Sequence, residues 1–569
     1  MRKAIKILIA FITLAVAQQA AAAGALDEDA RLKAMREEAH ALVLIQSILG
    51  WYVRTQGEES IFEQTYKGHE DLFTADNIKY VQKFIGDNPG LTPDEKISLE
   101  FFRFYLTSEF MDINIAPLYD EVNNAEASAT VKIEWIDNDV PYRDLDGMLN
   151  NEADAEKRKK LQAAMASVWE NTLNPIHARI EEMVKQLAVE AGYPNYVAFS
   201  EQYRMVDLAK LIALSQEYIK KSDGLYRDLL AEQVREVMGY PLDQFTRSDI
   251  GRFAQAPYFN PYFPAELVTA SYRDYLEGIG LSLTTAAGTE IFIDEEQRPK
   301  KHPRAACFSI SPPGDVRFTV KPSGGIPDFE TFFHEGGHAQ HFANATAPLW
   351  EMQELGNNAV TEGYAIFFEG VWGNLAWLRK YQELVRDYNR LVAGDKKVPE
   401  LMDADIAKLL RNRALWMIYF VRRYAGAKLL YESILHEGDP ALYKKYFPGD
   451  TSDMQEVYRR LFSDAYGFEL TPADALRFRT DVDSSFYSAD YSRAFFLSVQ
   501  FEEGIERKFG EGWLDNPEAG KFLRENFWSR GNSLQAYEAA RLLGYDGLNT
   551  GAFERRIELM LRQSEELIQ

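Results

Sequence analysis

Apolar residues recur at three- and four-residue spacing along most of the chain from Leu26 to the C-terminus, and Pro and Gly interrupt the pattern at short intervals. This period predicts a succession of helices. Helix starts are marked at residues 92–95, Thr-Pro-Asp-Glu, where an N-cap hydroxyl, a proline and a reciprocal glutamate follow one another. Thr471-Pro472 and Asn516-Pro517 repeat part of that signal. The chain is therefore predicted to be mostly α-helical.

One stretch breaks the helical period. Residues 307–310 and 316–320 alternate in character around Ser-Pro-Pro-Gly-Asp at 311–315, a pattern that predicts a β-hairpin. At roughly 100–200 residues per domain, the length of 569 residues allows three or four small domains. The absence of repeats and long linkers favours one helical body over residues 24–569, with a small sheet.

The first residues have a different composition from the rest. Positive residues occupy positions 2, 3 and 6, an apolar run follows at 7–17, and small residues continue to Ala23. This is the order of a secretory signal peptide, and the apolar run is shorter than the about 20 residues that a membrane span needs. We expect residues 1–23 to be removed, the protein to be periplasmic or secreted, and no stable membrane anchor.

Charge and cysteine usage narrow the function. The chain carries 63 Lys+Arg against 87 Asp+Glu, a net charge of -24, and no local basic patch, which argues against a nucleic-acid partner. The single cysteine, Cys307, forbids an internal disulfide and is interpreted as a small buried hydrophobe. Neither a G-x-S-x-G elbow nor a phosphate-binding G-x-x-x-x-G-K motif is present.

A metal-ligand motif follows the predicted hairpin directly. His334-Glu335-Gly336-Gly337-His338 is an H-E-x-x-H sequence that comes after a helix start at Pro327. Positions i and i+4 of a helix differ by about 40° in direction, so His334 and His338 face one point while Glu335 projects beside it. Two imidazoles and a carboxylate hold Zn²⁺ with a position left for water, whose proton an adjacent glutamate accepts.

Two glycines inside this helix predict a close backbone approach, because each costs up to about 1 kcal/mol relative to alanine. The third ligand is expected from a later apolar helix around residues 358–369. Glu362 is favoured, because a metal offsets the cost of burying its charge. Glu369, two turns later, is the alternative or an outer hydrogen-bond acceptor, and Glu354 lies in a loop-like stretch. His341 is expected at the surface or behind a ligand.

The motif resembles that of the gluzincin peptidases of the thimet oligopeptidase and angiotensin-converting enzyme families. Similarity covers about residues 190–560 and is strongest from Cys307 to Glu369. The resemblance implies a fold of two helical halves around a deep channel, one zinc, a catalytic core at about 300–510, and hydrolysis of short peptides. It also implies Glu335 as general base and acid, Glu362 as third ligand, and a sheet edge that pairs with the peptide backbone.

Residues 491–503 resemble the segment that carries the catalytic tyrosine of these families. The resemblance assigns oxyanion stabilisation to Tyr491, with Tyr487 as second candidate. These families also place a histidine shortly before the tyrosine, whereas residues 470–500 contain none, and Asp481 occupies the corresponding position. The alternatives for the missing donor are His302, Arg493 and Tyr487.

Two alternatives stay open at this point. Arg479 replaces a lysine that in converting-enzyme relatives binds the substrate's terminal carboxylate, so it is either a carboxylate ligand or a surface charge. The clamp would favour release of C-terminal dipeptides, whereas an endo-oligopeptidase would not need it. The second function class is a catalytically impaired peptide-binding protein on the same scaffold, motivated by the missing histidine.

Overall fold

The computed structural model describes Leu26, residues 29–58 and residues 61–569, so the predicted signal peptide lies outside the described residues. Helix accounts for 72% of the protein and strand for 4%, which confirms the mostly α prediction. Within the described residues, no helix combines the length and the apolar character that a membrane span requires. The two halves and the deep channel stay a prediction.

Helices fill the N-terminal part up to the sheet. They are α3 (Ala30–Gln56), α4 (Phe62–Thr65), α5 (Ala75–Asp87), α6 (Pro93–Ser128), α7 (Leu145–Asn151), α8 (Ala155–Val168), α9 (Asn174–Glu190), α10 (Tyr196–Arg204), α11 (Leu208–Met238), α12 (Ile250–Gln255) and α13 (Val268–Gly278). Thr92 caps α6 in the predicted capping box, since its side chain accepts from the backbone N–H of Glu95 and Glu95 bonds back.

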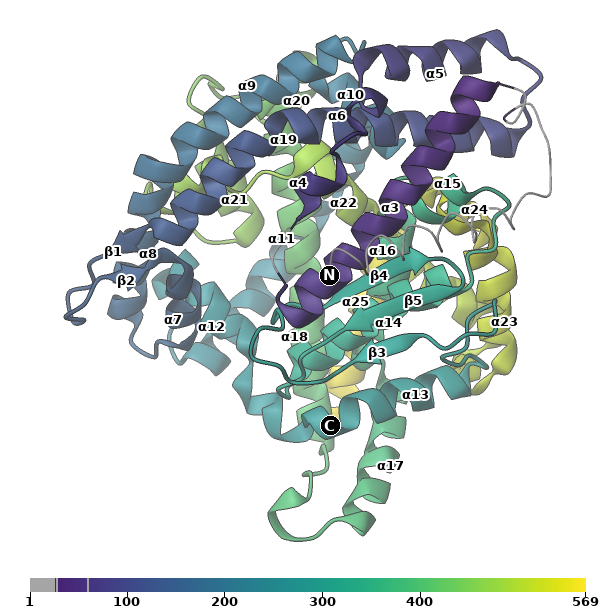
Figure 1. Ribbon diagram of the computed structural model, residues 1–569. Helices are drawn as coiled ribbons and strands as arrows, with labels where there is room; N and C mark the ends of the chain where they lie inside the picture. The colour runs from purple at the N-terminus through teal and green to yellow at the C-terminus, as the bar shows by residue number, and fades with distance from the viewer. Residues whose placement is uncertain (1–25, 27–28, 59–60) are drawn as a thin grey trace.

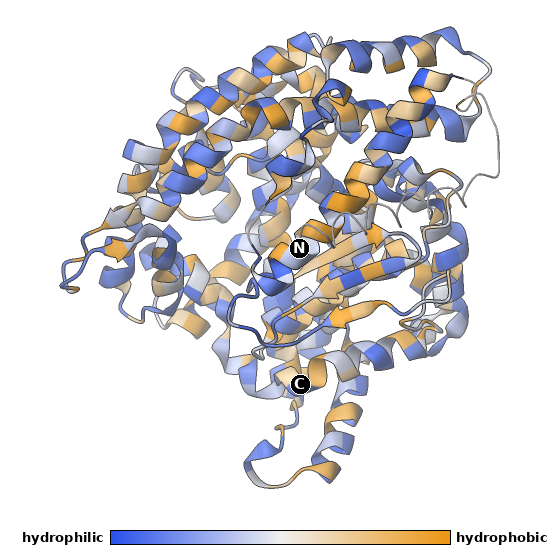
Figure 2. Ribbon diagram, in the orientation of Figure 1, coloured by the Kyte–Doolittle hydropathy of each residue, from blue (hydrophilic) through white to orange (hydrophobic). Residues whose placement is uncertain are grey.

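Helices also form the rest of the chain after the sheet. They are α14 (Ile326–Ala343), α15 (Trp350–Glu354), α16 (Ala359–Glu369), α17 (Leu375–Leu391), α18 (Asp403–Val421), α19 (Leu429–Leu435), α20 (Pro440–Tyr446), α21 (Met454–Tyr466), α22 (Tyr487–Phe509), α23 (Pro517–Asn526), α24 (Ala536–Leu542) and α25 (Gly551–Ile568). Asn516 caps α23 as predicted, but Thr471 precedes only a short 3₁₀ segment. Figure 2 shows alternating hydrophilic and hydrophobic bands along the outer helices, as their period requires.

The predicted hairpin is present as β4 (Ala306–Ser311) and β5 (Asp315–Thr319), which pair antiparallel with an irregularity between Ser309 and Ser311. The pattern did not predict β3 (Phe292–Asp294), which pairs parallel with β5 and gives the sheet order β3-β5-β4. A separate two-stranded ladder joins β1 (Thr130–Val131) and β2 (Val140–Pro141). The strand β4 is thus an edge of the larger sheet (Figure 1).

The sheet positions the motif helix. Phe318 of β5 packs edge-on against Phe332 of α14 at 5.2 Å, and on the opposite face Phe308 of β4 packs against Trp51 of α3 at 5.5 Å. Cys307 pairs with Phe318 and therefore belongs to the α14 face. Figure 1 shows α14 and α16 behind the strands and α3 in front of them. The motif helix is fixed by apolar contacts against the sheet.

A candidate metal centre between two helices

Three side chains from two helices converge on one point. The ligand atoms of His334 and His338 on α14 and of Glu362 on α16 all lie within 4.8 Å of one another. Oε2 of Glu362 is 3.4 Å from Nε2 of His334 and 3.7 Å from Nε2 of His338. The spacing argument predicted both histidines, and of the glutamates that it left open Glu362 is the one in this group.

The donor set fits a zinc ion. Oε2 of Glu362 is buried and has no hydrogen-bond partner, although it belongs to a carboxylate in an otherwise apolar helix. Ligand bonds of about 2.1 Å at tetrahedral angles place ligand atoms about 3.4 Å apart, close to the two separations observed. An orphaned buried oxygen that faces two imidazole nitrogens is thus accounted for by a divalent cation.

Protonation of the three groups follows their surroundings. Burial lowers the pKa of His338 to about 4, so this imidazole is neutral at neutral pH, as a metal ligand must be. Burial also acts to lower the pKa of His334, but the neighbouring carboxylates of Glu362 and Glu369 outweigh that and raise it. Burial acts to raise the pKa of Glu362, yet the two imidazoles and the hydrogen bond from Tyr487 lower it to about 2. The carboxylate is therefore ionised.

The two glycines of the motif allow the helices to approach closely. A Cβ on Gly336 would lie 2.5 Å from the ring of Tyr272, whose hydroxyl donates to the Gly336 carbonyl at 2.9 Å. A Cβ on Gly337 would lie 2.7 Å from Cα of Ala365 on α16. The predicted close approach is confirmed, and what approaches is Tyr272 and the ligand-bearing helix itself.

An ionic chain supports His334 from behind. Nδ1 of His334 lies 3.2 Å from Oε2 of Glu369, and Arg413 of α18 donates to Oε1 of the same carboxylate at 3.0 Å and to Glu330 at 3.2 Å. Glu369 is thus the outer acceptor that the sequence offered as an alternative. A carboxylate at Nδ1 fixes the ring so that Nε2 faces the metal position.

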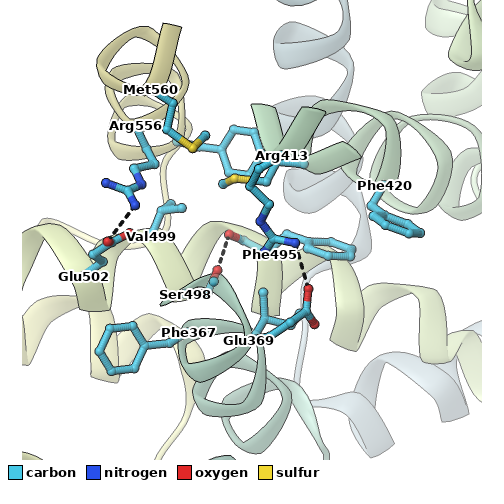
Figure 3. Close-up of a pocket in the computed structure, with 14 residues that line it drawn as sticks. Phe367, Glu369, Arg413, Phe420, Phe495, Ser498, Val499, Glu502, Arg556 and Met560 are labelled. Atoms are coloured by element: carbon cyan, nitrogen blue, oxygen red, sulfur yellow. Dashed lines mark hydrogen bonds and ion pairs between the residues drawn. The ribbon is translucent and has the colours of Figure 1, made fainter. Parts of the chain in front are cut away.

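Glu369 and Arg413 also border a cavity between α16, α18, α22 and α25 (Figure 3). The cavity has a volume of about 20 Å³. Figure 3 shows the Arg413 guanidinium directed toward Glu369 on one side of the cavity. The ion pair between Glu502 and Arg556 lies on the other side. This volume holds about one water molecule, so the cavity is too small for a larger ligand and belongs to the packing behind His334.

A threonine supports the second histidine. Oγ1 of Thr361 lies 2.9 Å from Nδ1 of His338 and 3.0 Å from Nδ1 of His341. A histidine that ligates through Nε2 carries its proton on Nδ1, so Thr361 accepts from His338 and donates to His341. His341 is fully buried, which makes the expectation of a surface position wrong and its place behind a ligand correct.

The two candidate tyrosines have different tasks. Tyr487 donates to Oε1 of Glu362 at 2.6 Å and accepts from the Asn358 amide at 3.2 Å, which leaves Oε2 of Glu362 for the metal position. Tyr491 packs against Tyr487 with ring centroids 5.2 Å apart. Its hydroxyl has no hydrogen bond to any residue that the structure describes, so Tyr491 is the candidate tyrosine whose hydroxyl is free among these residues.

The start of α22 holds both tyrosines in place. Ser485 and Phe486, directly before Tyr487, have φ values of 48° and 54°, which residues other than glycine rarely adopt. Arg204 of α10 donates to the Ser485 carbonyl at 2.8 Å and to Asp490 of α22 at 2.8 Å. These contacts offset the strain of the left-handed turn and fix where the helix begins.

Glu335 lies between the metal group and the sheet edge. Burial raises the pKa of this carboxyl, while the positive charge of His334 and the backbone N–H of Cys307 on β4 act in the opposite direction. A carboxylate with a raised pKa takes up a proton more readily than an exposed one. Its position beside the ligands agrees with the spacing argument.

The remaining candidates lie elsewhere. Arg479 is half-buried and ion-paired with Glu181 of α9, so it is not an isolated surface charge, and its role as a carboxylate ligand stays a prediction. Arg493 is fully buried and paired with Asp490. Asp481 is also buried, and Arg423 and Tyr458 each bond it at 2.8 Å, so it holds segments together.

Two further residues named in the sequence are also outside the metal group. His302 is exposed on the loop before β4, where Nδ1 accepts from the Arg304 N–H at 3.0 Å. Glu354 ends the short helix α15, not a loop, and its Oε1 lies 3.3 Å from Nε2 of His40. Neither residue belongs to the candidate metal group, and the role of His302 as a second donor stays a prediction.

Sequence reasoning missed Thr361, Arg413 and Asn358. Thr361 precedes Glu362 directly and Asn358 lies one turn before it. Their closeness in sequence to a predicted ligand could therefore have identified them. Arg413 comes from a helix more than forty positions away and had none. A scan against family models gives no match for this chain, and neither does a search of curated proteins.

Proposed function

We propose that this protein is a zinc metallopeptidase that hydrolyses short peptides. One observation carries the proposal: the unpartnered Oε2 of Glu362 faces Nε2 of His334 and of His338, while Glu335 lies beside them. One zinc ion per chain would be held by these three residues. Bound there, zinc would act as a Lewis acid toward a peptide carbonyl and would acidify water.

The chain's own residues then supply the proton transfers. Glu335 takes a proton from the attacking water on its carboxylate and gives it to the nitrogen of the leaving amine. Tyr491, whose hydroxyl is free, donates to the oxygen that becomes negative during the attack. Tyr487 keeps Glu362 in one orientation through its 2.6 Å hydrogen bond.

The edge of the sheet favours an extended peptide as substrate. β4 is an edge strand, and its Cys307 N–H points to the side where Glu335 lies. A peptide that adds to this edge brings its own amide bonds next to Glu335. We further propose that the protein acts outside the cytoplasm after export, as its N-terminal residues predict.

Metal analysis and one substitution test the proposal. Purified protein should contain about one zinc per chain, and Glu335→Gln should keep the zinc but lose at least about 100-fold of the peptide cleavage, since a general base contributes that much. His338→Ala should lose the metal instead. A library of short peptides analysed by mass spectrometry gives the rates.

Normal cleavage by the Glu335→Gln protein would contradict the mechanism. If the wild-type protein bound zinc and peptides without cleaving them, it would be the binding protein that the missing histidine motivated. The burial of Asp481 in ion pairs is the observation that keeps this second function in view.

A further inference from the structure

The loop that leads into β4 is tied firmly to the end of α3. Lys301 is buried and donates to the carbonyls of Asp294 and Val320, each at 2.7 Å. Arg54 of α3 donates to the Ala305 carbonyl at 3.1 Å, and its own carbonyl accepts from the His302 N–H at 2.9 Å. The position of the loop relative to the sheet is therefore fixed.

Two guanidinium groups in this region have no acidic partner. Arg304 is exposed, and neither Arg304 nor Arg54 forms an ion pair with a carboxylate of the described residues. Nε of Arg54 is buried without a hydrogen-bond partner. Arg54 bonds the carbonyl of Ala305, the residue that follows Arg304, so the two guanidinium groups belong to the same region. Burial and the charge of Arg304 both lower the pKa of Arg54. An anion between them would relieve the repulsion of the two charges.

Both arginines lie at the start of the strand that packs against the motif helix. β4 begins at Ala306, directly after the residue that Arg54 bonds, and β4 contacts α14, which carries His334, Glu335 and His338. The charges of Arg54 and Glu335 accordingly act on each other. Arg304 lies two residues before Ala306, the first residue of β4. A peptide that pairs with the β4 edge and continues past the start of the strand would bring one of its residues toward Arg304.

We propose that Arg54 and Arg304 form a subsite for a carboxylate of the peptide substrate, and that they determine specificity. The subsite rests on the proposed peptidase function. Arginine presents a planar pair of N–H donors that matches a carboxylate. The carboxylate is either the C-terminus of the peptide or an aspartate or glutamate side chain. Arg479 is already paired with Glu181, so we expect Arg54 and Arg304 to bind the carboxylate.

Matched peptides test the subsite. One short neutral sequence is prepared with a free C-terminus, with an amidated C-terminus, and as amidated variants that carry a single glutamate or glutamine at successive positions. Values of kcat/KM are measured for the zinc-loaded wild-type protein and for Arg304→Gln, Arg304→Lys and Lys300→Gln. Lys300 is exposed on the same loop, so its substitution removes the same charge and serves as control.

We expect the wild-type protein to prefer a carboxylate-bearing peptide by about 10- to 100-fold, the effect of a hydrogen bond to a charged group. Arg304→Gln should abolish the preference and spare the amidated neutral peptide, Arg304→Lys should restore part of it, and Lys300→Gln should keep it. Preference for the free C-terminus identifies that source, and preference for glutamate at one position identifies a side chain. Equal cleavage of all peptides by the wild-type protein, or equal slowing of all by Arg304→Gln, would overturn the subsite.

Binding separates the subsite from the chemistry. Fluorescently labelled acid and amide peptides are titrated into the zinc-loaded Glu335→Gln protein with and without Arg304→Gln. If the wild-type protein cleaves no peptide, hydrolysis fails as a function, yet tighter binding of the acid peptide that depends on Arg304 still supports the subsite. Equal binding of both peptides, or none, refutes it.

Discussion

Replacement of Thr361 by valine should weaken zinc binding more than it weakens the fold. Valine keeps the shape of threonine but removes the oxygen that lies 2.9 Å from His338 and 3.0 Å from His341. The Nδ1–H of His338 then has no acceptor when Nε2 ligates a metal. Loss of such a hydrogen bond to a ligand lowers metal affinity by about 10- to 100-fold, or about 1.4–2.8 kcal/mol.

The assay is competition for Zn²⁺ with a chromophoric chelator at neutral pH. Thr361→Ser keeps the hydroxyl and should bind zinc within about threefold of the wild-type protein, because the donor and acceptor remain. Thr107→Val is a matched control, since Thr107 is also buried and bonds a backbone carbonyl at 2.8 Å, but lies on α6. It should destabilise the protein and leave zinc affinity unchanged.

Wild-type affinity in Thr361→Val would refute this reasoning, because the hydrogen bond would then not orient the ligand. A loss of zinc affinity of equal size in Thr107→Val would also refute it. In that case general loosening of the fold, not the orientation of His338, would control the metal.

Two further substitutions test the packing of the site and the burial of a histidine. Gly337→Ala should destabilise the protein by about 1–3 kcal/mol, because its Cβ would meet the α16 backbone at 2.7 Å, whereas Gly224→Ala, in open space on α11, should stabilise it by up to about 1 kcal/mol. Equal melting temperatures would contradict this. Burial lowers the pKa of His436 from 6.5 to about 3, so its stabilising contribution is complete above pH 6.5 and is lost as pH falls toward 3. Between pH 7.5 and 5.5 the unfolding free energy of the wild-type protein should fall by about 1.4 kcal/mol more than that of His436→Phe. Urea titrations at both pH values measure these free energies, and an equal fall in the two proteins would refute the reasoning.

Local signals accounted for the elements that depend on nearby residues. The capping box at Thr92, the hairpin around residues 311–315 and the helix after Pro327 are set within one or two turns of chain. The three-residue strand β3 is too short for a periodic signal, and its pairing with β5 joins segments more than twenty residues apart. Such pairing depends on tertiary contacts, which a single sequence does not display.

The three residues of the candidate metal group were predictable from the sequence, whereas the residues that bond to them were not, for one physical reason. His334 and His338 are placed by the geometry of a single helix, and Glu362 was identified because an unpaired buried carboxylate is costly. Arg413 and Arg204 bond buried carboxylates from helices that are distant in sequence. Nothing in the sequence distinguishes these two arginines from the others. The pairing of Arg479 with Glu181 gave no sequence signal for the same reason, since the two residues are about three hundred positions apart.

The ion pairs around Asp481 explain why an aspartate, and not a histidine, fits this position. Asp481 accepts from Tyr458 and pairs with Arg423, and Lys428 bridges it to Asp483 at 3.4 and 2.6 Å. A neutral imidazole at this position would leave those two cations with one carboxylate between them, at a cost of several kcal/mol for the uncompensated buried charge. The aspartate is thus part of the framework before α22. For the proposed peptide hydrolysis, we expect the donor to the substrate to be Tyr491 or one of the guanidinium groups of Arg54 and Arg304 beside β4.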